Sequence, residues 1–202
     1  MKTILTNFLD SRLVELIKSN EVASFPTETV YGLGVIYDSE VAFNNLVDVK
    51  KRRPDKPFTL MLDNPEDIEK YAIISTKTKK IISKYMPGEI TILVEPKKDL
   101  YPWVTLNSKY IGIRVPNSSD VRNLINSVGK PMLVTSANIS SEPVCENFKE
   151  VYNTFNQKVA IIVEGELSGN IPSTIVICGD ELTLVREGKI SFEEIKKVWD
   201  EE

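Results

Sequence analysis

The chain has 202 residues, of which 25 are Lys or Arg and 29 are Asp or Glu, so its formal net charge is −4. This length suits one sizeable domain or two small ones. Because no Gly/Ser linker or internal repeat divides the sequence, we predict a single domain over residues 1–202. The mildly acidic balance argues against a protein that binds nucleic acid over its whole surface.

The sequence contains no histidine. This absence excludes Ser-His-Asp and Cys-His catalysis, zinc sites with histidine ligands, and an imidazole general base. The two cysteines, Cys145 and Cys178, cannot form a CxxC metal site or a disulfide framework. A single disulfide between them is formally possible, but we expect free thiols in a reducing compartment.

The first residues carry an apolar patch that is too short for a signal-peptide core. No apolar run approaches the roughly 18–20 residues that span a bilayer. We therefore expect a cytoplasmic protein with no membrane partner.

Helical and strand patterns alternate along the chain. Apolar spacing and capping residues predict helices around 9–17, 43–47, 64 onward, 75–86, 118–129, 148–156 and 191–199. Short β-branched runs predict strands at 22–25, 58–62, 90–94, 111–115, 132–134, 159–163, 174–177 and 182–185. This alternation indicates an α/β fold, and the turn at Gly179-Asp180 predicts a hairpin that makes the sheet mixed rather than all parallel.

Four polar or basic segments follow or precede predicted strands, where α/β folds bind ligands. They are FPTETVYGLG (25–34), VKKRRPDKPF (49–58), PMLVTSANIS (131–140) and the pair IPSTIV (171–176) with LVREG (184–188). Taken alone, the basic segment is as typical of a solvated helix end as of a binding site, and the other three are more typical of ordinary turns or a surface charge. No Walker loop, no GxGxxG motif and no DxD pair is present, so a nucleotide or metal would have to be held in another way.

Taken together and in this order, the four segments resemble the YrdC/TsaC family of L-threonylcarbamoyladenylate synthases, from about Ser11 to Gly188. Lys50-x-Arg52 before Lys56-Pro57 is similar to the family's K-x-R segment. A second register, Lys51-x-Arg53-Pro54, also fits, but the first keeps the spacing to Pro57. The strand IGIRVPN is similar to the one that carries a ligand-contacting arginine, here Arg114.

The resemblance implies a twisted, mixed parallel and antiparallel sheet flanked by helices, with a large concave, positively charged cavity. It implies an enzyme that condenses L-threonine, bicarbonate and ATP to threonylcarbamoyl-AMP and pyrophosphate. A separate complex would then transfer the threonylcarbamoyl group to tRNA. Mg²⁺ would accompany ATP without a tightly bound metal, and tRNA or the transfer complex would be a further partner.

The resemblance also implies roles for twelve residues. Lys50 and Arg52 would be catalytic, because no enzyme nucleophile is needed and positioning with charge neutralisation suffices. ATP would be bound by Arg52, Lys56, Thr135, Ser136, Asn138 and Arg186. Threonine would be bound by Thr27, Thr29, Tyr31, Arg114 and Ser173.

Two positions depart from the family pattern. Met61 stands where some members carry a histidine, and Ser141 stands where glycine is common. The segment PFTLM is also similar to the YciO branch, which tends to lose the S-x-N segment that is intact here. Two alternatives therefore stay open: a YciO-like paralogue with another small substrate, and an RNA-binding module that uses the basic segment without catalysis.

Overall fold

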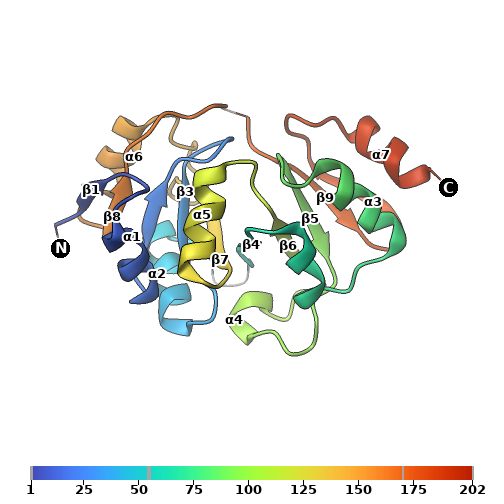
Figure 1. The fold of residues 1–202 in the computed structure, drawn as a ribbon, viewed down its shortest axis with the longest axis horizontal. Coiled ribbons are helices and arrows are strands. Elements are labelled where there is room, and N and C mark those ends of the chain that lie inside the picture. The colour runs from blue at the N-terminus through green and yellow to red at the C-terminus, as the bar shows by residue number, and fades with distance from the viewer. Residues whose placement is uncertain (1, 54–55, 170, 202) are drawn as a thin grey trace.

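The computed structural model describes residues 2–53, 56–169 and 171–201. Within these residues ten strands form one sheet, with helices packed against it (Figure 1). The first half of the chain contains β1 (Ile4–Thr6), α1 (Ser11–Lys18), β2 (Ala23–Phe25), β3 (Gly32–Ile36), α2 (Glu40–Lys50), β4 (Thr59–Met61), a 3-10 helix η1 (Pro65–Lys70), α3 (Thr76–Tyr85) and β5 (Ile90–Val94). The second half contains α4 (Pro102–Thr105), β6 (Ile111–Arg114), α5 (Ser119–Val128), β7 (Met132–Ser136), α6 (Phe148–Phe155), β8 (Ile161–Val163), β9 (Thr174–Cys178), β10 (Leu182–Arg186) and α7 (Phe192–Asp200).

The sheet is mixed, as the sequence predicts. Its strand order is β1-β8-β2-β3-β7-β4-β6-β5-β9-β10. Four neighbouring pairs are parallel, among them β4 with β6 and β5 with β9, and the remaining pairs are antiparallel. The predicted hairpin is present, because β9 and β10 pair antiparallel with Leu182 opposite Cys178.

Local capping explains several helix boundaries. The Ser118 side chain accepts a hydrogen bond from the Val121 amide at the start of α5, and Gly129 ends that helix in the left-handed region with φ 78°. At α7, Ser191 and Glu194 form the predicted capping box. These side chains satisfy amide groups that the first turn of a helix leaves without partners.

Some expected elements differ in the structure. Leu9 was expected in the first helix, but α1 begins at Ser11 because Asp10 accepts from the Arg12 amide as its N-cap, and Leu9 is 95% exposed. The expected helix after Asn64 is the short η1. Strands β1 and β3 and helix α4 were not predicted.

Strand β3 was missed because its glycines suggest a loop. A Cβ atom at Gly34 would lie 2.8 Å from side-chain atoms of both Phe25 and Met132. Glycine therefore lets the neighbouring strands bring these two side chains together over β3, and the close packing outweighs the weak strand propensity of glycine.

The molecule is elongated, with its two termini at opposite ends of the long axis (Figure 1). Helices α1, α2 and α5 accompany the half of the sheet that contains β3 and β7, and α3 and α7 pack together beside β5, β9 and β10. One hydrophobic core runs through both halves, from Leu13 in α1 to Trp199 in α7. No helix of the described residues is both long and apolar enough to cross a membrane.

Candidate active site

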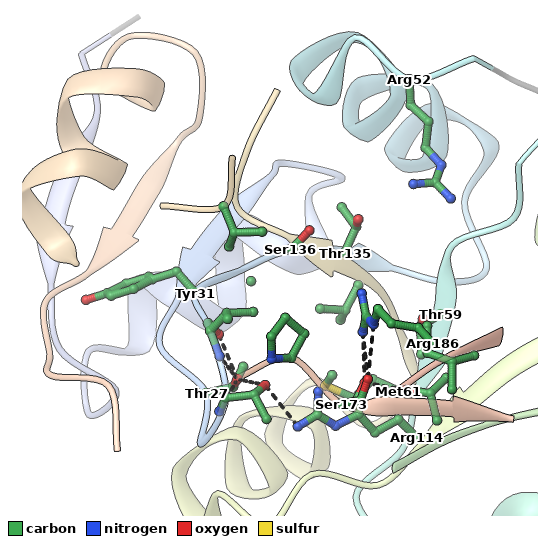
Figure 2. Close-up of a pocket in the computed structure, with 18 residues that line it drawn as sticks. Thr27, Tyr31, Arg52, Thr59, Met61, Arg114, Thr135, Ser136, Ser173 and Arg186 are labelled. Atoms are coloured by element: carbon green, nitrogen blue, oxygen red, sulfur yellow. Dashed lines mark hydrogen bonds between the residues drawn. The ribbon is translucent and has the colours of Figure 1, made fainter. Parts of the chain in front are cut away.

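A cavity of about 250 Å³ lies where the two halves of the sheet meet. Its wall is built by β3, β4, β5, β6, β7, β9 and β10 together with the loops that follow β2 and α2. Nine of the twelve predicted site residues line it: Thr27, Thr29, Tyr31, Arg52, Arg114, Thr135, Ser136, Ser173 and Arg186 (Figure 2). Among the described lining residues three are arginines and none is acidic.

Arg114 is fixed by a carboxylate that the sequence analysis did not assign. Its Nη2 donates to Glu28 Oε1 at 2.8 Å and to Thr29 Oγ1 at 3.1 Å. Glu28 Oε1 also accepts from the Asn117 amide at 2.7 Å, so it joins the loop after β2 to the segment after β6. The two side chains are only 7% and 9% exposed. This buried pair holds the Arg114 guanidinium at the cavity wall.

Thr27 organises the loop in which Glu28 lies. Its hydroxyl accepts from the amides of Thr29 and Val30 at 3.1 and 3.2 Å and donates to the Val30 carbonyl at 2.7 Å. A threonine hydroxyl that bonds its own following backbone stabilises a tight turn. The Pro-Thr-Glu-Thr sequence therefore sets the position of Thr29 and, through Glu28, that of Arg114.

A second arginine is tied to the segment before β9. Arg186 donates from Nε and Nη2 to the Ser173 carbonyl at 3.2 and 2.8 Å (Figure 2). The Ser173 hydroxyl in turn lies 2.9 Å from Thr91 Oγ1. Burial and, after it, the positive charge of Arg114 lower the pKa of Arg186. An anion between the two arginines would relieve this repulsion.

The third arginine, Arg52, reaches the cavity from the opposite side (Figure 2). Its Nε donates to the Lys56 carbonyl at 3.1 Å and its Nη2 to the Pro57 carbonyl at 3.0 Å. Its guanidinium carbon also lies 5.0 Å from the centre of the Phe58 ring. Of the two arginines in the alternative registers, Arg52 lines the cavity and Arg53 does not; Pro54 and Asp55 lie outside the described residues.

Lys50 lies behind the cavity wall. The side chain is 3% exposed, and its Nζ donates to the Ser136 carbonyl at 2.5 Å, to Ser136 Oγ at 3.3 Å and to Asn138 Oδ1. Asn138 also accepts from Ser136 Oγ at 2.8 Å and donates to the carbonyls of Ile139 and Glu142. Neither Lys50 nor Asn138 lines the cavity. Both hydrogen-bond to Ser136, which does line the cavity.

The ammonium group of Lys50 is therefore a buried cation with three oxygen partners. Burial, and to a smaller extent the charge of Arg52, lowers the pKa of Lys50 to about 8. The three donors of an ammonium group match these three acceptors, so the charged form is fully hydrogen-bonded despite the cost of burying it.

Two further predicted site residues, Tyr31 and Lys56, do not turn their polar groups into the cavity. The Tyr31 hydroxyl donates to the Gly165 carbonyl at 2.7 Å and points away from the cavity, so only other atoms of this residue line the cavity (Figure 2). Burial raises the pKa of Tyr31 to about 12. The Lys56 side chain is exposed and does not line the cavity.

The structure places both residues that depart from the family pattern, Met61 and Ser141. Met61 lines the cavity next to Arg114 in the β4–β6 register. Ser141 adopts a φ of 70°, in the left-handed region that favours glycine. This backbone conformation explains why glycine would be common there.

Residues that the sequence analysis missed complete the wall. They are the lining residues Thr59, Thr91, Val134, Val144, Pro172 and Ile175. Glu28, which was also missed, does not line the cavity but bonds Arg114. Several of the lining residues lie in strands and read as ordinary strand residues. Only the alternation of side chains in β4, β5 and β9, once the strands are placed in a sheet, turns them toward the cavity.

The described residues contain no group of three or more Asp, Glu or Cys side chains that could hold a metal ion. Cys145 and Cys178 are both buried free thiols, and burial raises the pKa of each. The chemistry of the cavity is therefore that of guanidinium groups and hydroxyls, which suits an anionic ligand.

The family model for Sua5/YciO/YrdC proteins, which carries the description "Telomere recombination", matches residues 15–188. The chain belongs to this family. The match includes all twelve of the predicted site residues and both sides of the cavity.

Two curated relatives are named threonylcarbamoyl-AMP synthase. The protein of Wigglesworthia glossinidia brevipalpis is 34% identical over 154 residues, which are 75% of this chain and 79% of that protein. The protein of Bacillus subtilis is 32% identical over 187 residues, or 91% of this chain and 54% of that protein. The chain thus spans about half the length of the Bacillus relative.

Solved structures of the family have the same fold. Sua5 of P. abyssi in complex with L-threonine superposes with a TM-score of 0.91 at 27% identity, over 97% of this chain and 61% of that one. YciO of E. coli superposes with a TM-score of 0.84 at 23% identity, over 96% of this chain and 98% of that one. The likeness to YciO concerns the fold alone.

Proposed function

We propose that this protein is an L-threonylcarbamoyladenylate synthase. The observation that carries the proposal is the convergence of Arg52, Arg114 and Arg186 on one cavity whose other polar groups are hydroxyls. The three arginines come from distant parts of the chain, and the relatives named threonylcarbamoyl-AMP synthase support the same activity. ATP and threonine carry several negative charges between them, which matches a cavity with three cations.

The reaction joins three substrates. The threonine amine and bicarbonate give a carbamate with loss of water, and a carbamate oxygen then attacks the α-phosphorus of ATP. The bond from that phosphorus to the bridging oxygen breaks, pyrophosphate leaves, and threonylcarbamoyl-AMP remains. No group of the protein forms a covalent bond in this sequence, so the absence of histidine is no obstacle.

The proposed roles follow from the contacts. Arg114, held by Glu28, binds the threonine carboxylate, with Thr27, Thr29 and Ser173 nearby. Arg52, Arg186, Thr135 and Ser136 bind the phosphates and neutralise charge that develops as pyrophosphate leaves. Lys50 and Asn138 act by positioning Ser136, and Lys56 adds positive charge outside the cavity. Tyr31 contributes to the wall.

Both ligands have to share this one cavity. The carbamate carbon stands between the threonine nitrogen and the α-phosphate, and reacting atoms approach to about 3–3.5 Å. Such a pairing requires the arginine of β6 and the arginine of β10 to lie in one site, which is how the two are placed. Mg²⁺ would bind through the ATP phosphates rather than through a dedicated set of carboxylates.

We also propose that residues 1–202 act as one domain in the cytoplasm, since one sheet and one core run through the chain and tRNA modification takes place there. The product would pass to a separate complex that modifies tRNA. These statements about partners rest on the assigned activity.

Mass spectrometry of a reaction with ATP, bicarbonate and threonine tests the function directly. The expected result is the mass of threonylcarbamoyl-AMP, with pyrophosphate released only when threonine is present. An adenylate formed faster with another amino acid would favour the paralogue instead. No adenylate with any amino acid, together with RNA binding whose affinity falls steeply with salt, would favour the binding module.

A further inference from the structure

Strand β10 carries Arg186 into the cavity, although packing holds this strand only weakly. It is the last strand in the order of the described sheet, with β9 as its neighbour. Residues 183–186 are exposed, and Leu182 is half-buried. Because an edge strand that buries so little surface gains little stability from packing, other contacts have to fix the position of the arginine.

The main-chain ladder between β9 and β10 is irregular next to this arginine. Leu184 lies opposite Val176, and the following pair joins Arg186 to Ile175, so that Val185 is an extra residue on β10. Such a β-bulge disrupts the ladder locally and bends the strand. The hydrogen bonds of a regular sheet therefore do not by themselves determine how the chain leaves the sheet at Arg186.

Thr174 holds the main chain that follows the arginine. Its hydroxyl accepts from the Gly188 amide at 2.9 Å and donates to the Ile190 carbonyl at 2.5 Å. Thr174 itself is fully buried in β9, and its amide donates to the Glu89 carbonyl at 3.0 Å. The hydroxyl thus ties the turn between β10 and α7 to a buried strand in the sheet.

Ser173 and Thr174 hold Arg186 from two sides of β9. Neighbouring side chains of a strand point to opposite faces, and accordingly Ser173 lines the cavity whereas Thr174 does not. The Arg186 guanidinium donates to the Ser173 carbonyl at 2.8 Å, while the main chain beyond it is bound by the Thr174 hydroxyl. An arginine fixed in this way loses less conformational entropy when it binds an anion.

The other contacts of this turn lie within it or at the surface. Glu187 Oε1 accepts from the Phe192 amide at 2.7 Å, which joins the turn to the start of α7. Lys189 forms an ion pair with Glu89 at 2.8 Å, but its side chain is exposed, and exposed ion pairs contribute little. The Thr174 hydroxyl is therefore the buried link between the turn and β9.

The charges in the cavity make such a link useful. Burial and, after it, the positive charge of Arg114 lower the pKa of Arg186. Repulsion between two guanidinium groups favours positions of Arg186 that lie further from the cavity. A main chain that is fixed on the core side of β9 opposes this displacement before an anion is bound.

We propose that Thr174 is a positioning residue, whose hydroxyl fixes the turn after β10 and thereby keeps Arg186 in the cavity. The proposal rests on the proposed function for the identity of the anion that Arg186 binds during the reaction. Thr174 does not line the cavity, so its effect on anion binding has to pass through the arginine.

Titration calorimetry with inorganic tripolyphosphate as the probe tests this role. Thr174→Val removes the hydroxyl and keeps the shape of the side chain, whereas Thr174→Ser keeps the hydroxyl and removes the methyl group. Thr174→Ala also lacks the hydroxyl and serves if Thr174→Val does not fold. Thr183→Val is the matched control, because it makes the same change at an exposed position of the neighbouring strand. Each variant is also prepared in an Arg186→Ala background.

We expect Thr174→Val to weaken tripolyphosphate binding at least about fivefold, which corresponds to the net contribution of about one hydrogen bond. Thr174→Ser and Thr183→Val should stay within about twofold of wild type, a range below that contribution. In the Arg186→Ala background Thr174→Val should cause no further loss, because residues that act through one another are not additive.

Three results would overturn the proposal. The first is wild-type affinity in the variants that lack the Thr174 hydroxyl, or no tripolyphosphate binding by wild type. The second is an equal loss in Thr174→Ser and Thr174→Val, which would assign the effect to packing of the methyl group. The third is an equal loss from Thr174→Val with and without Arg186, which would show that the effect does not pass through the arginine.

The mass-spectrometric assay separates this proposal from the proposed function. If wild type forms threonylcarbamoyl-AMP and Thr174→Val binds tripolyphosphate as wild type does, the positioning role is wrong and the function stands. If wild type forms no adenylate but the loss in Thr174→Val depends on Arg186, Thr174 positions the arginine for the anionic substrate of another reaction.

Discussion

Glu28 and Arg114 form a buried ion pair, 2.8 Å from Oε1 to Nη2, between the loop after β2 and the strand β6. Each residue comes from a segment that carries predicted site residues, and the pair links the two. Because a buried guanidinium keeps its orientation only when its partners are fixed, the carboxylate determines where Arg114 points.

We therefore predict that Glu28→Gln raises the KM for threonine at least about tenfold, since hydrogen bonds to charged groups contribute roughly 1.5–3 kcal/mol. The KM for ATP should change by less than about twofold. Steady-state kinetics with each substrate varied in turn checks this split. Glu166→Gln, at an exposed position, is the control. Equal increases of both KM values would contradict a role confined to Arg114.

Lys50 gives a prediction about stability at alkaline pH. The pKa of Lys50 is about 8 in the folded protein, against 10.5 as its ordinary value. Between these two pH values the unfolded chain binds more protons at this site than the folded chain does, so stability from this group rises with pH. Below pH 8 the cost of burying the charge is fully present.

The measurement compares wild type with Lys50→Met by urea unfolding at pH 7 and at pH 9.5. The free energy of unfolding of wild type, relative to the variant, should increase between the two pH values. At pH 7 the variant loses the bonds to Ser136 and Asn138, which are worth about 1–3 kcal/mol when their partners are left unsatisfied. Parallel pH profiles for the two proteins would show that Lys50 titrates in its ordinary range.

Much of this architecture can be predicted from the sequence. The capping residues Ser118 and Ser191 and the apolar stripes behind them identify α5 and α7, because these signals are local. Strand β3 cannot be recognised in this way, since Gly34 is explained only by Phe25 and Met132, which pack over it. A contact between segments that are far apart in sequence has no local signature.

The candidate site could likewise be predicted only in part from the sequence. Arg52, Ser136 and Arg186 could be named because their motifs are similar to those of a family. Glu28 lies within one of the four segments, but its link to Arg114 depends on how β2 and β6 are placed in the sheet. The position of Lys50 behind Ser136, rather than in the cavity, likewise depends on how the end of α2 is placed against β7.

Arg52 and Arg53 provide a test of the register. Arg52 lines the cavity and Arg53 does not. Arg52→Ala should lower kcat/KM about 100-fold, the loss that follows when one preorganised charge is removed from a transition state. Arg53→Ala removes the same group one residue away and should cost less than about threefold. A larger loss with Arg53→Ala would mean that Lys51 and Arg53 form the functional pair.

We also predict that the purified protein holds no stoichiometric transition metal. The chain has no histidine, and carboxylates bind Mg²⁺ loosely and largely through substrate phosphates. Elemental analysis of the protein purified without chelator should give zinc well below one equivalent, and chelator treatment followed by Mg²⁺ should restore full activity. One equivalent of zinc per chain would contradict this prediction.

Gly188 and Gly129 are needed for different reasons. A Cβ atom at Gly188 would lie 2.1 Å from the Pro172 carbonyl oxygen and 2.6 Å from the Thr174 nitrogen. These are main-chain atoms and cannot rotate away, so Gly188→Ala must displace the segment that contains Ser173. That segment supplies the carbonyl that holds Arg186. We expect a loss of stability of about 1–3 kcal/mol or more, together with weaker binding of tripolyphosphate.

Gly129 is the matched control. It ends α5 with φ 78° and has no atom within 4 Å of its Cβ position, so Gly129→Ala is strained only by its backbone conformation. Its cost should be about 1–2 kcal/mol, with unchanged tripolyphosphate affinity, because Gly129 does not line the cavity. Thermal unfolding and calorimetry of the two variants, compared at a temperature where both are folded, separate the effects. If Gly188→Ala binds tripolyphosphate as wild type does, the backbone around Ser173 does not determine the position of Arg186.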